Sequence, residues 1–122
     1  DEYGISTYVY YRRRSFNLSL FDDFVARKMK GIIRTKGVCW FSEENDMSFL
    51  FEQAGSQKLL REAGQWFATM PEDELEVMME REPQLQKDWD DSVGDRMQKI
   101  VFIGQHLDKE QIAKDLDACL VD

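Results

Sequence analysis

The chain contains few side chains of the types that carry covalent or metal chemistry: one histidine, His106, and two cysteines, Cys39 and Cys119. Nucleophilic catalysis needs a serine or cysteine held beside a base, and this sequence offers a single imidazole. A transition-metal site usually takes three or four nitrogen or sulfur ligands. The sequence therefore predicts no catalytic residue and leaves His106 and Cys119, which the last predicted helix separates, as weak candidates for a metal site. The alternative is that His106 is a polar residue in the turn before that helix.

Two segments partly resemble a nucleotide-binding and a calcium-binding motif, but neither segment matches its motif. Lys36 lies between two glycines, but five residues separate them instead of the four of a phosphate loop, and Lys36 precedes Gly37 inside a predicted strand. An acidic run near residue 90 resembles a calcium loop, yet Val93 stands where glycine is needed and Lys99 where glutamate is needed. The acidic run Glu72–Glu74 is assigned to a helix start rather than to acid–base catalysis.

The amino-acid composition and the net charge exclude some classes of binding partner. The 122 residues are 43% hydrophobic and 33% charged, which is typical of one compact globular domain. The net charge of −8 argues against nucleic acid as a partner, because a phosphate backbone repels an acidic surface. No apolar run approaches the roughly 18 residues that span a bilayer, so no membrane partner is expected. Cys39 and Cys119 form no CxxC pair and are predicted to be reduced core thiols of a cytoplasmic protein, with a disulfide as the alternative.

Strands and helices follow one another in an order that is typical of an α+β fold. Runs rich in β-branched and aromatic residues predict strands over residues 5–11, 32–41, 47–52, 57–62 and 98–103. Helices are expected after the first, fourth and fifth strands. The order strand, helix, three strands, helix, strand, helix predicts a mainly antiparallel sheet of four or five strands with helices packed on one face.

Capping residues predict where the helices begin and end. Asn17 or Ser19 should cap the first helix and Asp108 the last one. The middle helix is expected to start with a capping box formed by Thr69 and Glu72 and to break near Pro83. The first helix is expected to end at Gly31.

The strand over residues 32–41 is the most informative segment. Alternation places Ile32, Arg34, Lys36, Val38 and Trp40 on one face and Ile33, Thr35, Gly37, Cys39 and Phe41 on the other, uncharged face. The uncharged set suits a core, so Arg34, Lys36 and Trp40 are predicted to form an interaction face, since Arg and Trp are typical of interface centres. The alternative is that Arg34 and Lys36 pair with Glu52 or Glu62 while Trp40 serves as a cover.

A second group of cations, Arg12, Arg13 and Arg14, follows the first predicted strand. These side chains are interpreted either as solvating the edge of the sheet or as contacting an anion or a partner.

Several motifs in one order resemble the C-terminal domain of the CobW family, the metal-trafficking GTPases that are also called cobalamin-synthesis proteins. The resemblance extends from about Tyr3 to Val121 and departs at Ser15, where the family often has proline. The motifs are Ser15-Phe16 after the basic residues, Arg34-Thr35-Lys36-Gly37-Val38-Cys39-Trp40, Gly64-Gln65-Trp66, Asp95-Arg96, Ile100-Val101-Phe102-Ile103-Gly104, and Leu107-Asp108 before a closing helix.

The resemblance implies a role for the chain without a catalytic site in it. Family members carry an N-terminal GTPase domain with a metal-binding motif, and neither is present in this sequence, so residues 1–122 are expected to form one C-terminal domain with residues 1–4 as a linker remnant. GTP, Mg and a transition metal (Zn or Co) are expected only for the full-length protein. The implied function is that of a regulatory, protein-interaction domain of a GTP-dependent metallochaperone. Its expected partners are its own GTPase domain and a client metalloprotein, and the alternative is an independent metal-binding or small-ligand domain using His106 and Cys119.

Overall fold

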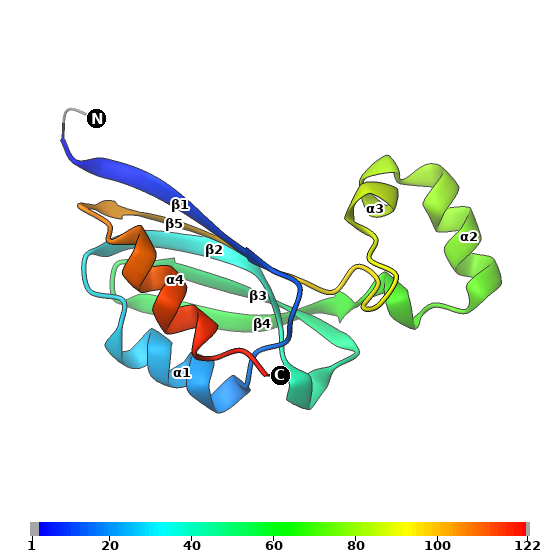
Figure 1. The fold of residues 1–122 in the computed structure, drawn as a ribbon, viewed down its shortest axis with the longest axis horizontal. Helices are drawn as coiled ribbons and strands as arrows, with labels where there is room; N and C mark the ends of the chain where they lie inside the picture. Colours follow the sequence, from blue (N-terminus) through cyan, green and yellow to red (C-terminus); the bar gives the residue numbers. More distant parts are fainter. Residues whose placement is uncertain (1–2, 122) are drawn as a thin grey trace.

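The computed structural model describes residues 3–121, and its core is a sheet with two helices on one face (Figure 1). The elements in chain order are β1 (Ile5–Arg12), α1 (Leu18–Arg27), β2 (Ile32–Trp40), β3 (Met47–Ala54), β4 (Gln57–Gln65), α2 (Glu72–Arg81), α3 (Pro83–Asp88), β5 (Gln98–Gln105) and α4 (Lys109–Asp117). Short 3-10 helices cover Ser42–Glu44 and Phe67–Thr69. None of the helices in the described part of the chain has the length and hydropathy needed to cross a membrane.

All five strands form one antiparallel sheet in the order β1-β5-β2-β3-β4. The strands β2, β3 and β4 follow one another as a meander, whereas β5 inserts between β1 and β2 although it comes last in the chain. The predicted α+β class with a mainly antiparallel sheet is confirmed. The sheet has two edges, β1 and β4, and its centre is formed by β5 and β2.

The helices α1 and α4 lie against the same face of the sheet and enclose the core (Figure 1). Both predicted caps are confirmed: Asn17 Oδ1 accepts from the Leu20 N–H at 2.8 Å, and Asp108 Oδ1 accepts from the Gln111 N–H at 3.1 Å. Each cap satisfies a backbone donor that a helix start leaves unpaired. Phe16 is fully buried between these helices and the sheet and joins a cluster of stacked aromatic rings.

Two expected helix boundaries are wrong. The capping box at Thr69 does not form, because the Thr69 hydroxyl donates to the Trp66 carbonyl and α2 begins after Pro71 without a side-chain cap. The first helix ends at Arg27 rather than at Gly31, which takes φ +84° in the turn into β2. The break at Pro83 is confirmed, since Pro83 occupies the first turn of α3, where a missing N–H costs nothing.

A bulge in β2 changes which side chains face the core. The register with β5 shifts between Ile32 and Arg34, so Ile32 is buried while Ile33 is 49% exposed, the reverse of the predicted alternation. Buried Gln53 on β3 holds this bulge: its Nε2 donates to the Ile32 carbonyl at 3.1 Å and to the Gly55 carbonyl at 2.6 Å. A bulge leaves backbone groups unpaired, and the amide of Gln53 satisfies one of them.

The N-terminal segment is tied to the end of β5. The Tyr3 carbonyl accepts from Gln105 Nε2 at 3.0 Å, and the Gly4 carbonyl accepts from the His106 N–H at 2.8 Å. Asp1 and Glu2, the other residues of the predicted linker remnant, lie outside the described residues.

Candidate docking face

The face of the sheet that α1 and α4 leave uncovered carries the predicted interaction residues. Arg34 and Lys36 of β2 point to this face, because Thr35 between them is buried on the helix side. In register, Arg34 lies beside Ile103 of β5, and Lys36 lies between Val101 of β5 and Glu52 of β3. We call Arg34, Lys36 and the outward-facing neighbours on the other strands the open face.

The two cations are not neutralised inside the domain. Among residues 3–121, neither Arg34 nor Lys36 forms an ion pair, and Glu52 is bound to Arg61 Nη2 at 3.5 Å. Glu62 lies opposite Phe49, whose side chain packs against the core on the helix side. The alternative prediction, in which Arg34 and Lys36 pair with Glu52 or Glu62, is therefore not confirmed, because neither pair forms among the described residues.

Trp40 does not present its ring to a partner. Its side chain is 7% exposed, and its Nε1 donates to Asn45 Oδ1 at 2.8 Å. The loop between β2 and β3 supplies this acceptor and covers the indole. The expectation of an accessible Trp40 is therefore corrected, and Arg34 and Lys36 are the accessible residues of the predicted interaction face.

Sequence analysis missed the apolar part of the open face. Ile5, Val9 and Tyr11 of β1 are 42–47% exposed and stand on the same face, since Tyr8 and Tyr10 between them point into the core. These residues alternate with core residues along β1, and this alternation is visible in the sequence. To recognise them as part of an exposed face, however, one must also know that β1 lies at the edge of the sheet. Large exposed apolar side chains in a row are typical of interaction surfaces.

A shallow hollow of about 500 Å³ lies over β2, β3 and β4 on this face. Arg34 and Lys36 line it together with Glu52, Ala54 and Leu59. Two cations without an ion pair in the described part of the chain, next to apolar side chains, are complementary to a surface that carries carboxylates beside apolar groups.

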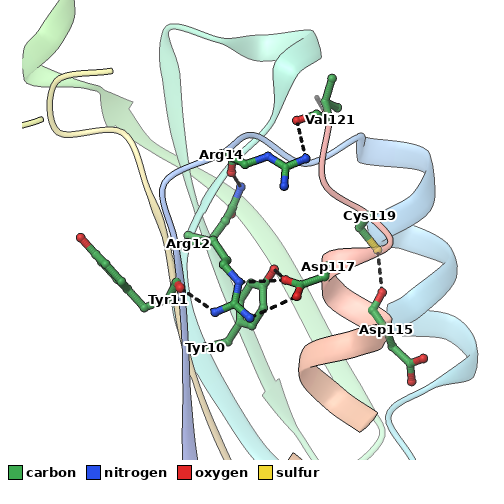
Figure 2. A network of polar contacts seen from close by, with 9 residues as sticks. Tyr10, Tyr11, Arg12, Arg14, Asp115, Asp117, Cys119 and Val121 are labelled. Atoms are coloured by element: carbon green, nitrogen blue, oxygen red, sulfur yellow. Dashed lines mark hydrogen bonds and ion pairs between the residues drawn. The ribbon is translucent and has the colours of Figure 1, made fainter. Parts of the chain in front are cut away.

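The three consecutive arginines after β1 are engaged within the domain. Arg12 stands over the Tyr10 ring and donates to both oxygens of Asp117 of α4, at 2.9 and 3.2 Å (Figure 2). Arg13 donates to the carbonyls of Arg96 and Gly94, and Arg14 donates to the Val121 carbonyl at 3.3 Å. Their primary role is to hold the end of β1 against α4 and the loop before β5, and contact with an anion or a partner stays a prediction.

The contacts of Asp117 with Arg12 and Tyr10 also change the pKa values of Asp117 and Tyr10. Burial alone would raise the pKa of Asp117, but the hydrogen bonds from Arg12 and from the Tyr10 hydroxyl, which donates at 2.8 Å, lower it below its usual range. Burial, followed by the hydrogen bond to Asp117, raises the pKa of Tyr10. The carboxylate is thus held in its charged form.

We expect Asp117→Asn to lower the free energy of unfolding at pH 7 by about 0.5–1 kcal/mol, because the asparagine still accepts from Tyr10 but loses the charge. The effect is small since the Arg12 and Asp117 side chains are 36% and 44% exposed and solvent screens the pair. A carboxyl whose pKa is lowered by folding contributes stability above its unfolded pKa of about 3.9, and this contribution is lost as pH falls through the folded pKa.

Urea unfolding at pH 7 and below pH 3 tests this, because the difference between the wild-type chain and Asp117→Asn should disappear in acid. Asp22→Asn, at an exposed position of α1, should show no difference at either pH. A difference of equal size at both pH values would mean that charge is not the cause.

The weak metal candidates are not brought together. His106 lies in the turn before α4 with φ 53°, whereas Cys119 follows α4 at its other end and donates to the Asp115 carbonyl at 3.5 Å. Burial raises the pKa of Cys119 to about 11, which disfavours the thiolate that metals bind. Within residues 3–121, no group of three or more His, Cys, Asp or Glu side chains is placed to hold a metal ion. Cys39 and Cys119 are both free thiols in the core, as predicted.

Several motif residues behind the family resemblance serve to position the ends of the sheet. Asp95 accepts from the N–H groups of Phe67 and Ala68, each at 2.9 Å, and fixes the turn after β4. Arg96 donates to the Asn45 carbonyl at 2.8 Å and to Asp46, which fixes the loop that covers Trp40. These contacts join segments that are about 30 and 50 residues apart in the chain.

An antiparallel sheet with two helices on one face and a charged, partly apolar open face defines a domain of the α+β class. The model of the cobalamin synthesis protein cobW C-terminal domain matches residues 5–120. The chain therefore belongs to the CobW C-terminal domain family.

Two known proteins show the extent of the similarity. The chain is 28% identical to zinc-regulated GTPase metalloprotein activator 1 of Dictyostelium discoideum over 98% of its own length, which is 26% of that protein. Its fold is similar to that of the Zn(II)-bound YjiA GTPase from E. coli, with a TM-score of 0.64 and 16% identity over 97% of this chain and 30% of that one. A triple mutant of YjiA, also Zn(II)-bound, gives the same values. The chain thus spans between a quarter and a third of the length of these proteins.

Proposed function

We propose that this domain is the regulatory interaction domain of a GTP-dependent metallochaperone of the CobW type. In this proposal the domain has no catalytic site of its own. GTP and Mg bind to an N-terminal GTPase domain of the same chain, and a transition metal, Zn or Co, is the cargo. The open face docks on that GTPase domain, and a client metalloprotein is the second candidate partner.

The observation that carries the proposal is the state of the open face. It holds two cations without an ion pair among the described residues, and the same face carries a row of exposed apolar side chains on β1, with β5 between the two groups. Exposed apolar side chains in a row are typical of a surface that a partner covers. The family membership and the name of the relative, a GTPase metalloprotein activator, support a GTPase domain as the occupant.

The mechanism is a difference in docking between nucleotide states. If the GTPase domain presents different surfaces with GTP and with GDP, the open face binds one of them more tightly and shifts the equilibrium between them. Such coupling is limited by the difference in affinity for the two states, and by linkage the docked domain changes nucleotide affinity by the same factor.

An amide NMR titration tests the proposal, with this labelled domain and its upstream GTPase domain loaded in turn with GTP and GDP. We expect shifts centred on Arg34, Lys36 and their β5 neighbours, of different size in the two nucleotide states. Shifts that are identical with GTP and GDP would refute the regulatory mechanism. The absence of shifts would refute docking on the GTPase domain and direct the search to a client.

We expect the double substitution Arg34→Ala with Lys36→Ala to weaken docking about tenfold, because two unpaired cations at an interface each contribute up to about 1 kcal/mol. The free energy of unfolding should change by less than about 0.5 kcal/mol, since neither side chain holds a partner in the domain. The measurement is the dissociation constant from the same titration.

The matched control removes two cations from the helix side, Lys109→Ala with Lys114→Ala on α4, and should leave docking unchanged. Unfolding of the Arg34/Lys36 variant would show instead that these residues are structural.

A further inference from the structure

A groove of about 460 Å³ lies where β2 ends, between the sheet and α3. Its apolar lining comes from four separate segments of the chain: Val38, Trp66, Leu85 and Met97. Trp66, Leu85 and Met97 are each 6–7% exposed, so they form a second apolar cluster apart from the core beneath α1 and α4. The pair α2 and α3 projects beyond the ends of the strands (Figure 1), and residues of α3 line one side of the groove.

The side of the groove next to the sheet is held by specific contacts. Asp95 fixes the Phe67 and Ala68 backbone beside it. A Cβ at Gly94 would lie 2.6 Å from the Ala68 Cβ, so the loop before β5 is packed closely against this corner. A surface that is already fixed binds at a lower cost in conformational entropy than one that must be ordered first.

One polar group at the groove has no partner. Trp66 Nε1 is buried and donates to no acceptor within residues 3–121. A buried donor without an acceptor costs about 1–3 kcal/mol. A peptide segment in the groove brings backbone carbonyls, which are the acceptors that this donor lacks.

The acidic residues around the groove indicate which kind of peptide segment it would bind. Glu82, Asp88 and Asp95 line it, no cation does, and in the described part of the chain none of the three forms an ion pair. The adjoining stretch from Glu72 to Asp88 contains seven acidic and two basic residues, five of the eight net negative charges of the chain. An apolar floor with an acidic rim is complementary to an apolar side chain flanked by lysine or arginine.

We propose that this groove binds a short basic segment of a partner protein, with one large apolar side chain packed between Leu85 and Met97 and its basic residues on Glu82 and Asp88. The site is separate from the cations of the open face and does not depend on docking of a GTPase domain.

The test is an NMR titration of the 15N-labelled 122-residue chain with three synthetic nonapeptides. The first has a central Phe-Leu pair flanked by lysine and arginine on both sides, the second has glutamate in place of all basic residues, and the third has alanine in place of the Phe-Leu pair. We expect only the first to shift the resonances of Leu85, Met97 and the Trp66 indole N–H, with the indole proton moving downfield as it gains an acceptor. Binding should weaken with added salt, since exposed charges are screened.

The substitution Glu82→Gln with Asp88→Asn should weaken binding of the first peptide about tenfold, while Glu44→Gln with Glu110→Gln, which removes two charges at exposed sites elsewhere, should not. The amide spectrum of each variant shows whether the fold is kept. No shifts at the groove up to millimolar peptide, or equal binding of the glutamate or alanine peptide, would overturn the proposal. Groove shifts that grow with protein concentration alone would overturn it in favour of a second copy.

Discussion

Replacing Gly37 with alanine is expected to destabilise the domain by about 3 kcal/mol or more, at the upper end of what overpacking in a core costs. Gly37 lies directly opposite Ile100 at the centre of the sheet. A Cβ at this position would overlap the Lys99 carbonyl oxygen and the Ile100 Cα. Both are backbone atoms, so no side-chain rotation relieves the overlap, and β2 and β5 would have to separate.

The position of Gly37 also connects stability with the open face. The ladder between β2 and β5 sets Lys36 beside Val101 and Arg34 beside Ile103. Moving the strands apart at Gly37 therefore disturbs the spacing between the cations and the apolar side chains next to them. We expect the Gly37→Ala variant to lose docking even at temperatures where it remains folded.

Urea unfolding of Gly37→Ala and Gly55→Ala side by side is the measurement. Gly55 has φ +60° and open space around its Cα, so alanine there costs only the left-handed conformation, about 1 kcal/mol. The comparison separates a steric overlap from a conformational penalty. Equal losses in the two variants would mean that the close approach of β2 and β5 is not what requires glycine at position 37.

The second large effect is expected for Phe16→Ala, with a loss of about 3–5 kcal/mol in the free energy of unfolding. Phe16 is fully buried and stacks on Tyr10 and Phe21, with ring centroids 6.0 and 5.2 Å away, and its ring is tilted against that of Phe41 at 6.3 Å. Removing this ring leaves a cavity surrounded by other rings, which cannot collapse to fill it.

Phe16 also joins three separate segments through its backbone. Its N–H donates to the Trp40 carbonyl at 2.8 Å, its carbonyl accepts from the Ser42 N–H, and the residue bridges to Leu120 near the end of the chain. The cost of its loss should therefore extend to the loop after β2 and to the segment after α4. Hydrogen exchange in those two segments should increase in the variant by more than it does in β4.

Two matched variants complete this experiment. Phe16→Leu keeps most of the volume and should cost less than half as much. Leu20→Ala, at a position of α1 that is 49% exposed, should cost under about 1 kcal/mol. If Phe16→Ala were no worse than Leu20→Ala, the aromatic cluster would not be the centre of the core.

Sequence analysis predicted those features of the fold whose cause lies within a few residues. The strands followed from runs of β-branched and aromatic residues. The caps at Asn17 and Asp108 were found because a capping side chain bonds to a backbone N–H only three residues away. The break at Pro83 was found because the proline ring excludes a helix locally. Arg34 and Lys36 were placed on the same face by strict alternation.

The errors lie where a distant residue decides the local structure. The bulge that buries Ile32 is held by Gln53, about 20 residues further along the chain, and alternation carries no sign of it. Trp40 looks exposed from its strand position, but the loop that covers it is fixed by Arg96. Thr69 has the sequence of a capping box and bonds to Trp66 instead, because the turn there is set by Asp95.

The sequence by itself therefore determined most of the elements, the outward direction of Arg34 and Lys36 and the family, because these depend on periodicity, on local hydrogen bonds and on ordered motifs. Only the tertiary structure decided which cations are left unpaired. Arg12 forms an ion pair with Asp117 across about 100 residues, whereas Arg34 and Lys36 form no ion pair within the described chain, since Glu52 opposite Lys36 is bound to Arg61. The physical reason is that β5 inserts between β1 and β2 from the far end of the chain, so the neighbours of each side chain are set by a pairing that local sequence does not encode.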